Sequence, residues 1–399
     1  MDILIHPQSL RGDINIIPSK SQAHRVLICA AFSDKATQIL CPETSRDMDA
    51  TADCLQALGA DIIRTETGYS VLPAKQIPKT AVLNCCESGS TLRFMLPVVG
   101  ALGVDATFLM EGRLPQRPLS PLWEEMERMG CRLTHPTETT LHCHGKLRSG
   151  TYYIDGSVSS QFITGLLLAL SLMDTENCLT ITGTVESKPY IDLTRQVLEQ
   201  FGSDPDHPGR KKLHSPGCIT VEGDWSNGAF FLAANSLNTE ANLQINGLKE
   251  TSVQGDRAAA HWIPKLSREH CIIDASDIPD LVPILSVTAA AKCGAIFTHI
   301  QRLRIKESDR VASTVAMIRN LGGQADASED HLTVYGTGLI GGTVDAVNDH
   351  RIAMSAAIAS TACTQDVCIL GAECVKKSYP RFWEEFSRLG GNYEQYLRR

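Results

Sequence analysis

Short apolar segments recur along the chain, and each is opened by polar residues or glycine. They begin near residues 21, 89, 159, 226, 280 and 350, and past the first turn they hold much alanine and little charge. This composition predicts helices that are buried on nearly all sides and packed closely against neighbours. A second, amphipathic segment follows most of them and ends where a helix-terminating glycine belongs, at Gly59, Gly130, Gly202, Gly322 and Gly390.

The segments define a repeat, with intervals of roughly 68, 70, 67, 54 and 70 residues between successive starts. Short β-rich runs such as 179–182 and 331–334 lie between the helices. The pattern predicts six copies of a unit of about 66 to 70 residues, approximately βαβαββ. The fourth copy is short, and its second helix, near residues 258–266, lacks the glycine stop.

Six units in 399 residues exceed one ordinary core, so we predict an α/β protein with two domains of three units each. Each domain would be an inside-out α/β barrel, with the buried helices inside and the sheets outside. The polar turns that open the helices would then gather in a cleft between the domains.

The composition is that of a soluble globular protein, with 43% hydrophobic and 21% charged residues. No apolar run is long enough for a membrane span, and the first residues resemble neither a signal nor a transit peptide. The 14 cysteines are spread singly apart from Cys85-Cys86, without metal-ligand spacing, which is typical of reduced thiols in the cytoplasm. The net charge of −8 gives no support for nucleic-acid binding, so residues that bind an anion must be concentrated at one site.

The densest charge lies between residues 302 and 310, which hold four cations and two carboxylates, Glu307 and Asp309. An apolar helical pattern begins directly afterwards, so Lys306 and Arg310 lie where a helix starts. Unpaired backbone N–H groups and the positive end of the helix dipole favour an anion there. A solvated run of charges with internal salt bridges is the alternative for this stretch taken alone.

Further cations also stand at the openings of predicted elements, and a solvated surface does not predict that placement. They are Lys20, Arg25, Arg117, Arg351 and Lys377. A substrate with two or more anionic groups does predict cations at these openings. Polar partners at other helix openings include Gly89, which permits a close approach of the backbone, and the Ser159-Ser160-Gln161 run. Asp280 opens an apolar helix and is either an ordinary helix-start charge or a proton acceptor, and His350 is either structural or catalytic.

These stretches resemble the EPSP synthase family of enolpyruvyl transferases, in family order over nearly the whole chain. The family's K-E-[ST]-D-R pattern matches Lys306–Arg310, and its D-H-R-x-A-M pattern matches Asp349–Met354. The other matching stretches are 18–25, 116–119, 156–162, 187–192, 223–226, 278–280 and 377–380. The family's fold has two domains, each of three βαβαββ units with the helices packed inside.

The resemblance implies transfer of the enolpyruvyl group of phosphoenolpyruvate to the 5-hydroxyl of shikimate 3-phosphate, with release of phosphate and without a metal or cofactor. The implied shikimate 3-phosphate site is Lys20, Ser21, Arg25, Ser159, Ser160, Gln161, Ser187, Asp280 and Lys306. The implied phosphoenolpyruvate site is Lys20, Gly89, Arg117, Gln161, Arg310, Arg351 and Lys377.

The resemblance also implies how protons move during addition and elimination through a tetrahedral intermediate. Asp280 would accept the hydroxyl proton, and Glu307, with Lys306 or Lys20 nearby, would serve the methylene carbon. We expect a cytoplasmic monomer with residues 1–18 and 224–399 in one domain and 19–223 in the other, closing on the phosphorylated substrate.

Three residues depart from the family's usual pattern, namely Glu87, Phe94 and Arg302, and they affect expectations for phosphoenolpyruvate affinity and inhibitor response. Two rival functions stay open. One is the sister enzyme that acts on UDP-N-acetylglucosamine, whose loop carries a cysteine shortly before Arg-Pro, whereas residues 108–118 contain none. The other is a binding relative without catalysis, against which the presence of Asp280, Glu307 and Lys20 speaks.

Overall fold

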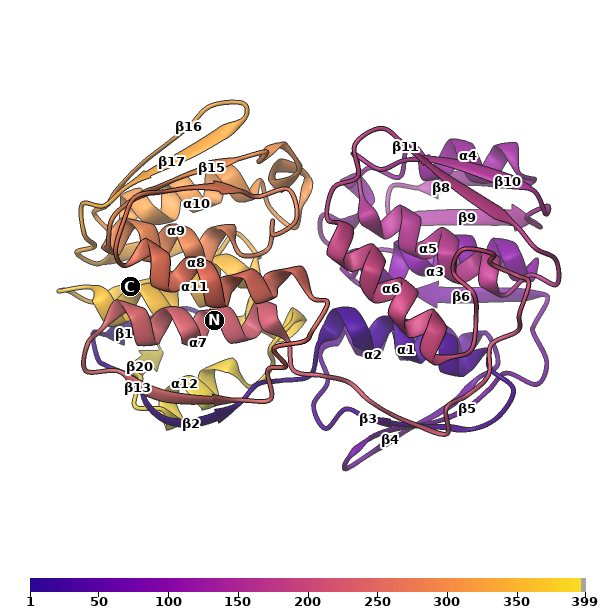
Figure 1. Ribbon diagram of the computed structural model, residues 1–399, viewed down its shortest axis with the longest axis horizontal. Helices are drawn as coiled ribbons and strands as arrows, with labels where there is room; N and C mark the ends of the chain where they lie inside the picture. The colour runs from indigo at the N-terminus through magenta and orange to yellow at the C-terminus, as the bar shows by residue number, and fades with distance from the viewer. Residues whose placement is uncertain (396–399) are drawn as a thin grey trace. The chain divides into compact units, whose positions relative to one another are not determined.

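The computed structural model describes residues 1–395 and divides into two compact units (Figure 1). The continuous unit contains Pro18–Glu222, and the discontinuous unit contains Met1–Ile17 together with the chain from Gly223 onward. The boundaries expected from the sequence lie one residue later at each crossing. That each unit folds as an independent domain stays a prediction.

The continuous unit contains three small sheets. The first has the order β12(Cys218–Thr220), β3(Thr37–Leu40), β5(Gly68–Leu72), β4(Asp61–Thr65). The second has the order β6(Thr80–Asn84), β7(Asp105–Leu109), β9(Thr140–Gly145), β8(Cys131–Thr137), and the third pairs β10(Thr151–Asp155) with β11(Cys178–Thr182). The helices are α1(Lys20–Ala31), α2(Arg46–Ala57), α3(Gly89–Leu102), η1(Leu114–Gln116), α4(Leu122–Arg128), α5(Ser160–Ser171) and α6(Lys188–Gln200).

The discontinuous unit also contains three sheets. Their orders are β13(Asn242–Asn246), β2(Arg11–Asn15); β14(Cys271–Asp274), β15(Ala295–Thr298), β17(His331–Tyr335), β16(Gln324–Ala327); and β18(Gly342–Asp345), β19(Val367–Leu370), β1(Ile3–His6), β20(Asn392–Gln395). The α-helices are α7(Trp225–Leu237), α8(Ala259–Leu266), α9(Val282–Ala291), α10(Arg310–Asn320), α11(His350–Ala359) and α12(Phe382–Arg388). The 3₁₀ turns are η2(Gly255–Ala258), η3(Gln301–Ile305), η4(Ser360–Ala362) and η5(Ala372–Lys377).

The six repeats predicted from the helix spacing are present, but two of them are incomplete within the described chain. The repeats built around α1, α3, α9 and α11 each have a parallel strand pair followed by an antiparallel hairpin, as βαβαββ requires. The repeats built around α5 and α7 end after their parallel pair. The fourth interval is short because its repeat lacks the hairpin. The third repeat also lacks the hairpin, but the irregular residues 203–217 take its place and keep the interval near its usual length.

Three of the repeats receive a strand from elsewhere in the chain. β1 supplies the last sheet with its third strand, and β2 pairs with β13 in the fourth repeat. In the continuous unit β12, just before the chain leaves that unit, pairs with β3 of the first repeat. Each unit therefore consists of three repeats, and at least one sheet in each unit pairs strands that are far apart in sequence.

The alanine-rich first helices are buried in the interior of their units, as their composition predicts. All residues of α11 are buried, and so are nine of the ten in α9. The helices of each unit stack beside one another in Figure 1, with the short strands around them. Gly165 of α5 lies against α3, where an added Cβ would stand 2.2 Å from the Arg93 carbonyl oxygen, so this helix pair requires a glycine.

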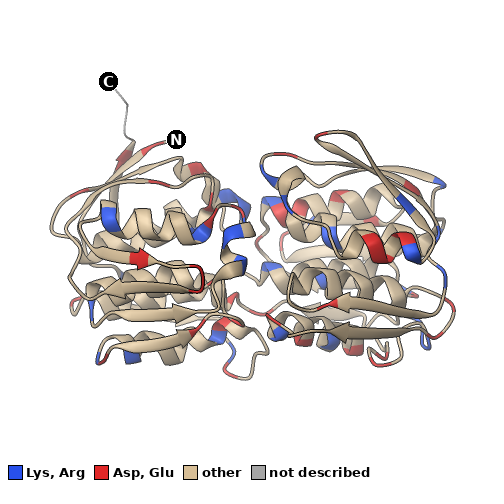
Figure 2. Cartoon of the chain, turned by 90° about the horizontal axis from the view of Figure 1, so that it is seen from above, with Lys and Arg blue, Asp and Glu red and all other residues tan. Residues whose placement is uncertain are grey.

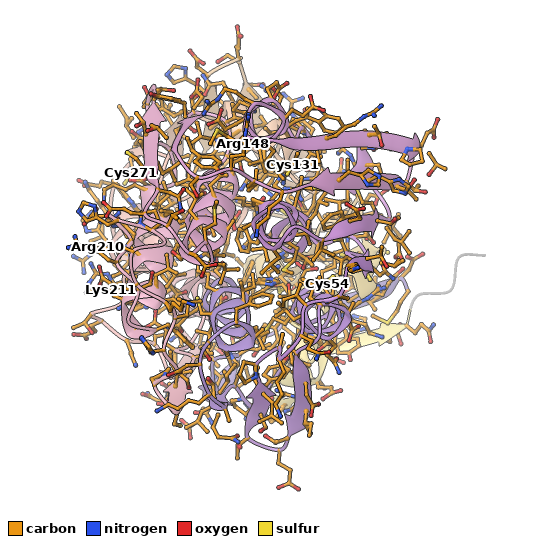
Figure 3. The ribbon with its side chains drawn as sticks, turned by 90° about the vertical axis from the view of Figure 1, so that its right-hand side faces the viewer. Cys54, Cys131, Arg148, Arg210, Lys211 and Cys271 are labelled. Atoms are coloured by element: carbon orange, nitrogen blue, oxygen red, sulfur yellow. The ribbon has the colours of Figure 1, made fainter. Side chains whose placement is uncertain are left out.

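The 14 cysteines carry free thiols. Cys54, Cys131 and Cys271, for example, lie on the separate elements α2, β8 and β14 (Figure 3). Among residues 1–395 no group of three His, Cys, Asp or Glu side chains could hold a metal ion, and no helix is long and apolar enough to cross a membrane.

Candidate active-site clusters

Charged residues occur at helix ends and in the connecting loops of both units (Figure 2). One group of them in the discontinuous unit is built around Asp280. One carboxylate oxygen lies 2.8 Å from Arg310 Nη1 and 3.7 Å from Lys306 Nζ. The other lies 2.9 Å from Arg351 Nη2. We call Asp280, Lys306, Glu307, Arg310, Asp349 and Arg351 the Asp280 cluster.

Helix caps fix the two arginines of this cluster. Asp309 accepts a hydrogen bond from the Ala312 backbone N–H and so starts α10 with Arg310 in its first turn. Asp349 does the same for α11, whose first turn holds Arg351. Asp349 also accepts from Arg310 Nε at 3.0 Å, so the cap of α11 anchors the first residue of the preceding helix, α10.

The charges of this cluster set the proton affinity of Asp280. Burial raises the pKa of the Asp280 carboxyl, but Arg351, Lys306 and Arg310 together outweigh burial and hold that pKa well below its usual range. Burial opposes the charge of Arg310 as well, and Asp349, Glu307 and Asp280 more than compensate, so its pKa is raised. The cluster therefore presents a firmly ionised carboxylate held by three cations.

The ammonium of Lys306 has a pKa close to neutral pH. Burial lowers the pKa of its ammonium to about 8; Asp280 and Glu307 oppose this change, and Arg302 and Arg310 reinforce it. A lysine whose pKa lies near neutrality can donate and accept a proton during turnover.

This pKa gives a test of Lys306. Because the pKa is lowered to about 8, the cation is present below pH 8 and lost above it. If the ammonium form is needed, kcat/KM should fall about tenfold per pH unit above that point. Lys306→Arg keeps its charge throughout and should give a flat profile between pH 7 and 10, at a lower plateau. A wild-type profile that stays flat to pH 10 would contradict a role for Lys306 ionisation.

The continuous unit holds a second group of cations. Lys20, in the first turn of α1, lies with its ammonium 2.9 Å from Asp47 Oδ2, and both side chains are mostly covered. Asp47 stands in the first turn of α2, so this ion pair joins the openings of two helices. The backbone carbonyl of Ser21, the next residue, accepts a hydrogen bond from Arg25 Nη1 at 2.5 Å.

Arg25 lies in the interior of the continuous unit. Besides the Ser21 carbonyl, its guanidinium donates to Thr194 Oγ1 at 2.8 Å, to Thr164 Oγ1 at 3.1 Å and to the Tyr190 carbonyl at 3.0 Å. It also lies over the ring of Phe94, 5.0 Å from the ring centre. Burial lowers the pKa of Arg25 to about 9. These contacts tie α1 to α5 and α6, so Arg25 has a structural task in addition to any contact with substrate.

We expect Arg25→Lys to lower the free energy of unfolding by about 1–3 kcal/mol, because one ammonium cannot satisfy acceptors that a planar guanidinium reaches on three helices. Urea unfolding of the two proteins measures this difference. Arg195→Lys, at an exposed ion pair with Asp206 on the same unit, is the matched control and should stay within about 0.5 kcal/mol. Equal stability of Arg25→Lys and the wild type would contradict the structural task.

A third group surrounds the opening of α3. Ser88 caps this helix by accepting from the Thr91 backbone N–H. Arg93, one turn further on, donates to Gln161 Oε1 at 2.8 Å and to the Pro118 carbonyl at 2.9 Å, and Gln161 Nε2 donates to Ser90 Oγ at 3.0 Å. The openings of α3 and α5 and the loop that carries Pro118 therefore meet through side chains.

Gly89 allows Arg117 to lie against the first turn of α3. A Cβ at position 89 would stand 2.4 Å from Arg117 Nη1, 3.0 Å from Arg117 Cζ and 3.1 Å from Arg93 Nη1. Only a residue without a side chain fits there while Arg117 keeps this place. Two guanidinium groups beside a helix start are an arrangement that suits an anion, so anion binding here stays a prediction.

The comparisons with known proteins bear on the whole chain. Residues 5–386 match the EPSP synthase (3-phosphoshikimate 1-carboxyvinyltransferase) family. The chain belongs to this family. Among its relatives, the 3-phosphoshikimate 1-carboxyvinyltransferases of Clostridium kluyveri and Clostridium acetobutylicum are each 37% identical, over 99% of this chain and 98% of theirs.

The fold agrees with this membership. The solved structure of EPSP synthase from Acinetobacter baumannii superposes with a TM-score of 0.80 at 21% identity, covering 99% of this chain and 100% of that one. The predicted inside-out α/β architecture is confirmed by this likeness. The chain is a transferase, and the comparisons do not favour the nucleotide-sugar alternative.

The remaining family-matched residues also lie at element openings. Ser159 caps α5 by accepting from the Gln161 backbone N–H, and the buried Ser160 follows it. Ser187 precedes α6 in a left-handed conformation, with φ of 54°. Lys377 ends η5 and donates to the Asn348 carbonyl at 2.8 Å, just before α11. Within each unit, the polar openings of several helices are thus linked by contacts; their assembly into one cleft stays a prediction.

Several residues of this EPSP synthase family member are prominent in the structure although our sequence-based site sets omit them. Arg93 contacts the predicted residue Gln161, Asp47 holds Lys20, and Asp349 holds Arg310. Asp256, which contacts Ser226, belongs with them. A helix-cap pattern before Arg351 marks Asp349, but Asp47 and Asp256 lie in ordinary polar contexts, and only the folded chain brings them to the cations.

Proposed function

We propose that this chain transfers the enolpyruvyl group of phosphoenolpyruvate to the 5-hydroxyl of shikimate 3-phosphate and releases phosphate, as a step of the shikimate pathway. Family membership supports the reaction, because relatives matched over nearly their full length are named for it. The observation that carries the chemical part of the proposal is Asp280, a buried carboxylate held by Lys306, Arg310 and Arg351.

Residues of both units take part in binding. Lys20, Ser21, Arg25, Ser159, Ser160, Gln161, Ser187, Asp280 and Lys306 bind shikimate 3-phosphate. Lys20, Gly89, Arg117, Gln161, Arg310, Arg351 and Lys377 bind phosphoenolpyruvate. Planar guanidinium groups suit the carboxylate and phosphate of phosphoenolpyruvate, because each can donate two parallel hydrogen bonds.

The reaction begins with attack of the 5-hydroxyl oxygen on the central carbon of phosphoenolpyruvate, while a proton is added to its methylene carbon. Asp280 accepts the hydroxyl proton, and Glu307, with Lys306 or Lys20 nearby, supplies the proton for carbon. In the elimination step a proton leaves the methyl group, phosphate departs and the enol double bond forms again. No metal ion is required for this balance.

Binding of substrate raises the proton affinity of Asp280, which makes it a better general base. In the ligand-free chain Arg310 and Arg351 hold its pKa low, which makes it a weak base. When the anionic groups of phosphoenolpyruvate share these guanidinium groups, the cations stabilise the Asp280 carboxylate less. Its pKa then rises, so Asp280 becomes a stronger base once both substrates are bound.

The chain also works as a monomer in the cytoplasm, where reduced thiols such as its 14 free cysteines are typical. Sedimentation at micromolar concentration tests the monomer.

Phosphate release from phosphoenolpyruvate tests the reaction, with shikimate 3-phosphate and UDP-N-acetylglucosamine as alternative acceptors and no metal added. Release with the shikimate ester alone is expected. Release with the nucleotide sugar alone would overturn the assigned acceptor. Tight binding of both proposed substrates without release would make the chain a binding protein.

A further inference from the structure

A buried carboxylate that the proposed reaction does not use lies next to the Asp280 cluster. Asp256 belongs to η2, a short 3₁₀ turn just before α8, and is 3% exposed. Its Oδ2 atom accepts a hydrogen bond from the hydroxyl of Ser226, in the first turn of α7. Ionisation of an aspartate in such a buried position lowers the free energy of unfolding, which indicates that its charge has a role.

The Ser226 hydroxyl connects Asp256 to Arg351. Its oxygen accepts a hydrogen bond from Arg351 Nη2 at 3.2 Å, and the same Nη2 lies 2.9 Å from Asp280 Oδ2. A serine hydroxyl has one proton to donate. Since that proton points to Asp256, the lone pairs of the oxygen are left facing Arg351.

We propose that Asp256 is a positioning residue: its carboxylate orients the Ser226 hydroxyl, which in turn fixes the Arg351 guanidinium between Asp280 and phosphoenolpyruvate. This inference rests on the proposed roles of Arg351 and Asp280. In this proposal Asp256 acts on phosphoenolpyruvate through Ser226 and Arg351.

The electrostatic surroundings separate this role from a merely structural one. Burial raises the pKa of Asp256 to about 6, the Asp280 and Asp224 carboxylates add to this rise, and Arg351 and the Ser226 hydrogen bond oppose it. A pKa above the usual value means that ionisation weakens folding, so this cost is absent at low pH and grows as the pH rises through 6. An asparagine would fill the same space without that cost. The contact through Ser226 directs the charge of Asp256 toward Arg351.

Asp256→Asn is the principal variant for the test. At pH 8 we expect its KM for phosphoenolpyruvate to rise about tenfold or more, the range for a weakened charge-assisted hydrogen bond. Its KM for shikimate 3-phosphate should stay within about twofold, and its midpoint of thermal unfolding should equal or exceed that of the wild type. At pH 5, where wild-type Asp256 is protonated, the difference in KM for phosphoenolpyruvate between the two proteins should shrink to about twofold.

Two further variants complete the experiment. Ser226→Ala should raise the KM for phosphoenolpyruvate similarly, and adding Asp256→Asn to it should change nothing more, because both act through one contact. Asp326→Asn, at an exposed ion pair with Arg319 in the same unit, is the control for loss of an acidic charge and should leave both KM values unchanged.

An unchanged KM for phosphoenolpyruvate in Asp256→Asn at pH 8 would overturn the proposal. So would a lowered midpoint of unfolding with equal rises in both KM values, which indicates a structural role. If the wild-type protein releases no phosphate, the proposed function has failed instead. The positioning role is then judged by calorimetric binding of phosphoenolpyruvate, where the same ranking of variants supports it and equal affinities reject it.

Discussion

Asp280→Asn is expected to lower turnover by about 10²- to 10⁴-fold, the range that a positioned general base contributes. The amide keeps the shape of the side chain but cannot accept the hydroxyl proton. The amide also carries no charge to neutralise Lys306, Arg310 and Arg351. In the wild type these three cations lie 2.8–3.7 Å from the Asp280 carboxylate. Steady-state phosphate release with both substrates saturating measures the loss.

The control for Asp280→Asn is Asp274→Asn. Asp274 lies in the same unit in an exposed pair with His299, and its loss should leave turnover unchanged. Circular dichroism establishes that both variants are folded. Wild-type turnover by folded Asp280→Asn would remove Asp280 as the base and leave Lys306 and Glu307 as the acid–base groups to examine.

Gly89→Ala is expected to raise the KM for phosphoenolpyruvate by about 10- to 150-fold, the equivalent of one lost hydrogen bond to a charged group. The new methyl group would stand 2.4 Å from Arg117 Nη1, so the guanidinium must leave the first turn of α3. Stability should change little, because alanine suits a helix start and the displaced atoms are the end of a flexible side chain. Initial rates at varied phosphoenolpyruvate measure the effect.

A double variant separates this mechanism from a general disturbance of α3. Once Arg117→Ala has removed the nearest guanidinium, the closest remaining neighbour of the added methyl group is Arg93 Nη1 at 3.1 Å, the end of a flexible side chain. Gly89→Ala in that background should therefore cost less than about twofold in KM. A full effect of Gly89→Ala without Arg117 would show that the methyl group acts on the helix or on the substrate directly.

The repeat architecture was predictable because it is a local pattern repeated six times. Alanine-rich helices and terminal glycines mark each copy, whatever the rest of the chain does. The missing hairpin of the third repeat was not predictable, because residues 203–217 keep the interval near its usual length without forming strands. Nor could spacing reveal that β1, β2 and β12 complete sheets far from their sequence neighbours.

The candidate site was predictable to the extent that its residues stand at helix openings. Lys306, Arg310 and Arg351 are cations at such openings, and the folded chain brings them to Asp280. Their partners are harder to foresee, since Asp256 meets Ser226 across 30 residues of chain and has no distinctive motif. The sequence likewise did not reveal that Arg25 is committed to the interior of its unit.

Strands β1, β2 and β12 pair with partners far away in sequence, and this affects the order in which the two units can form during synthesis. β1 and β2 leave the ribosome before the other strands described, yet their partners β19 and β13 are made some 360 and 230 residues later. The continuous unit is complete soon after β12 has been synthesised, while the discontinuous unit must wait for β20, which pairs with β1. The N-terminal strands therefore remain edges without partners through most of synthesis, and the nascent chain must keep them from pairing elsewhere.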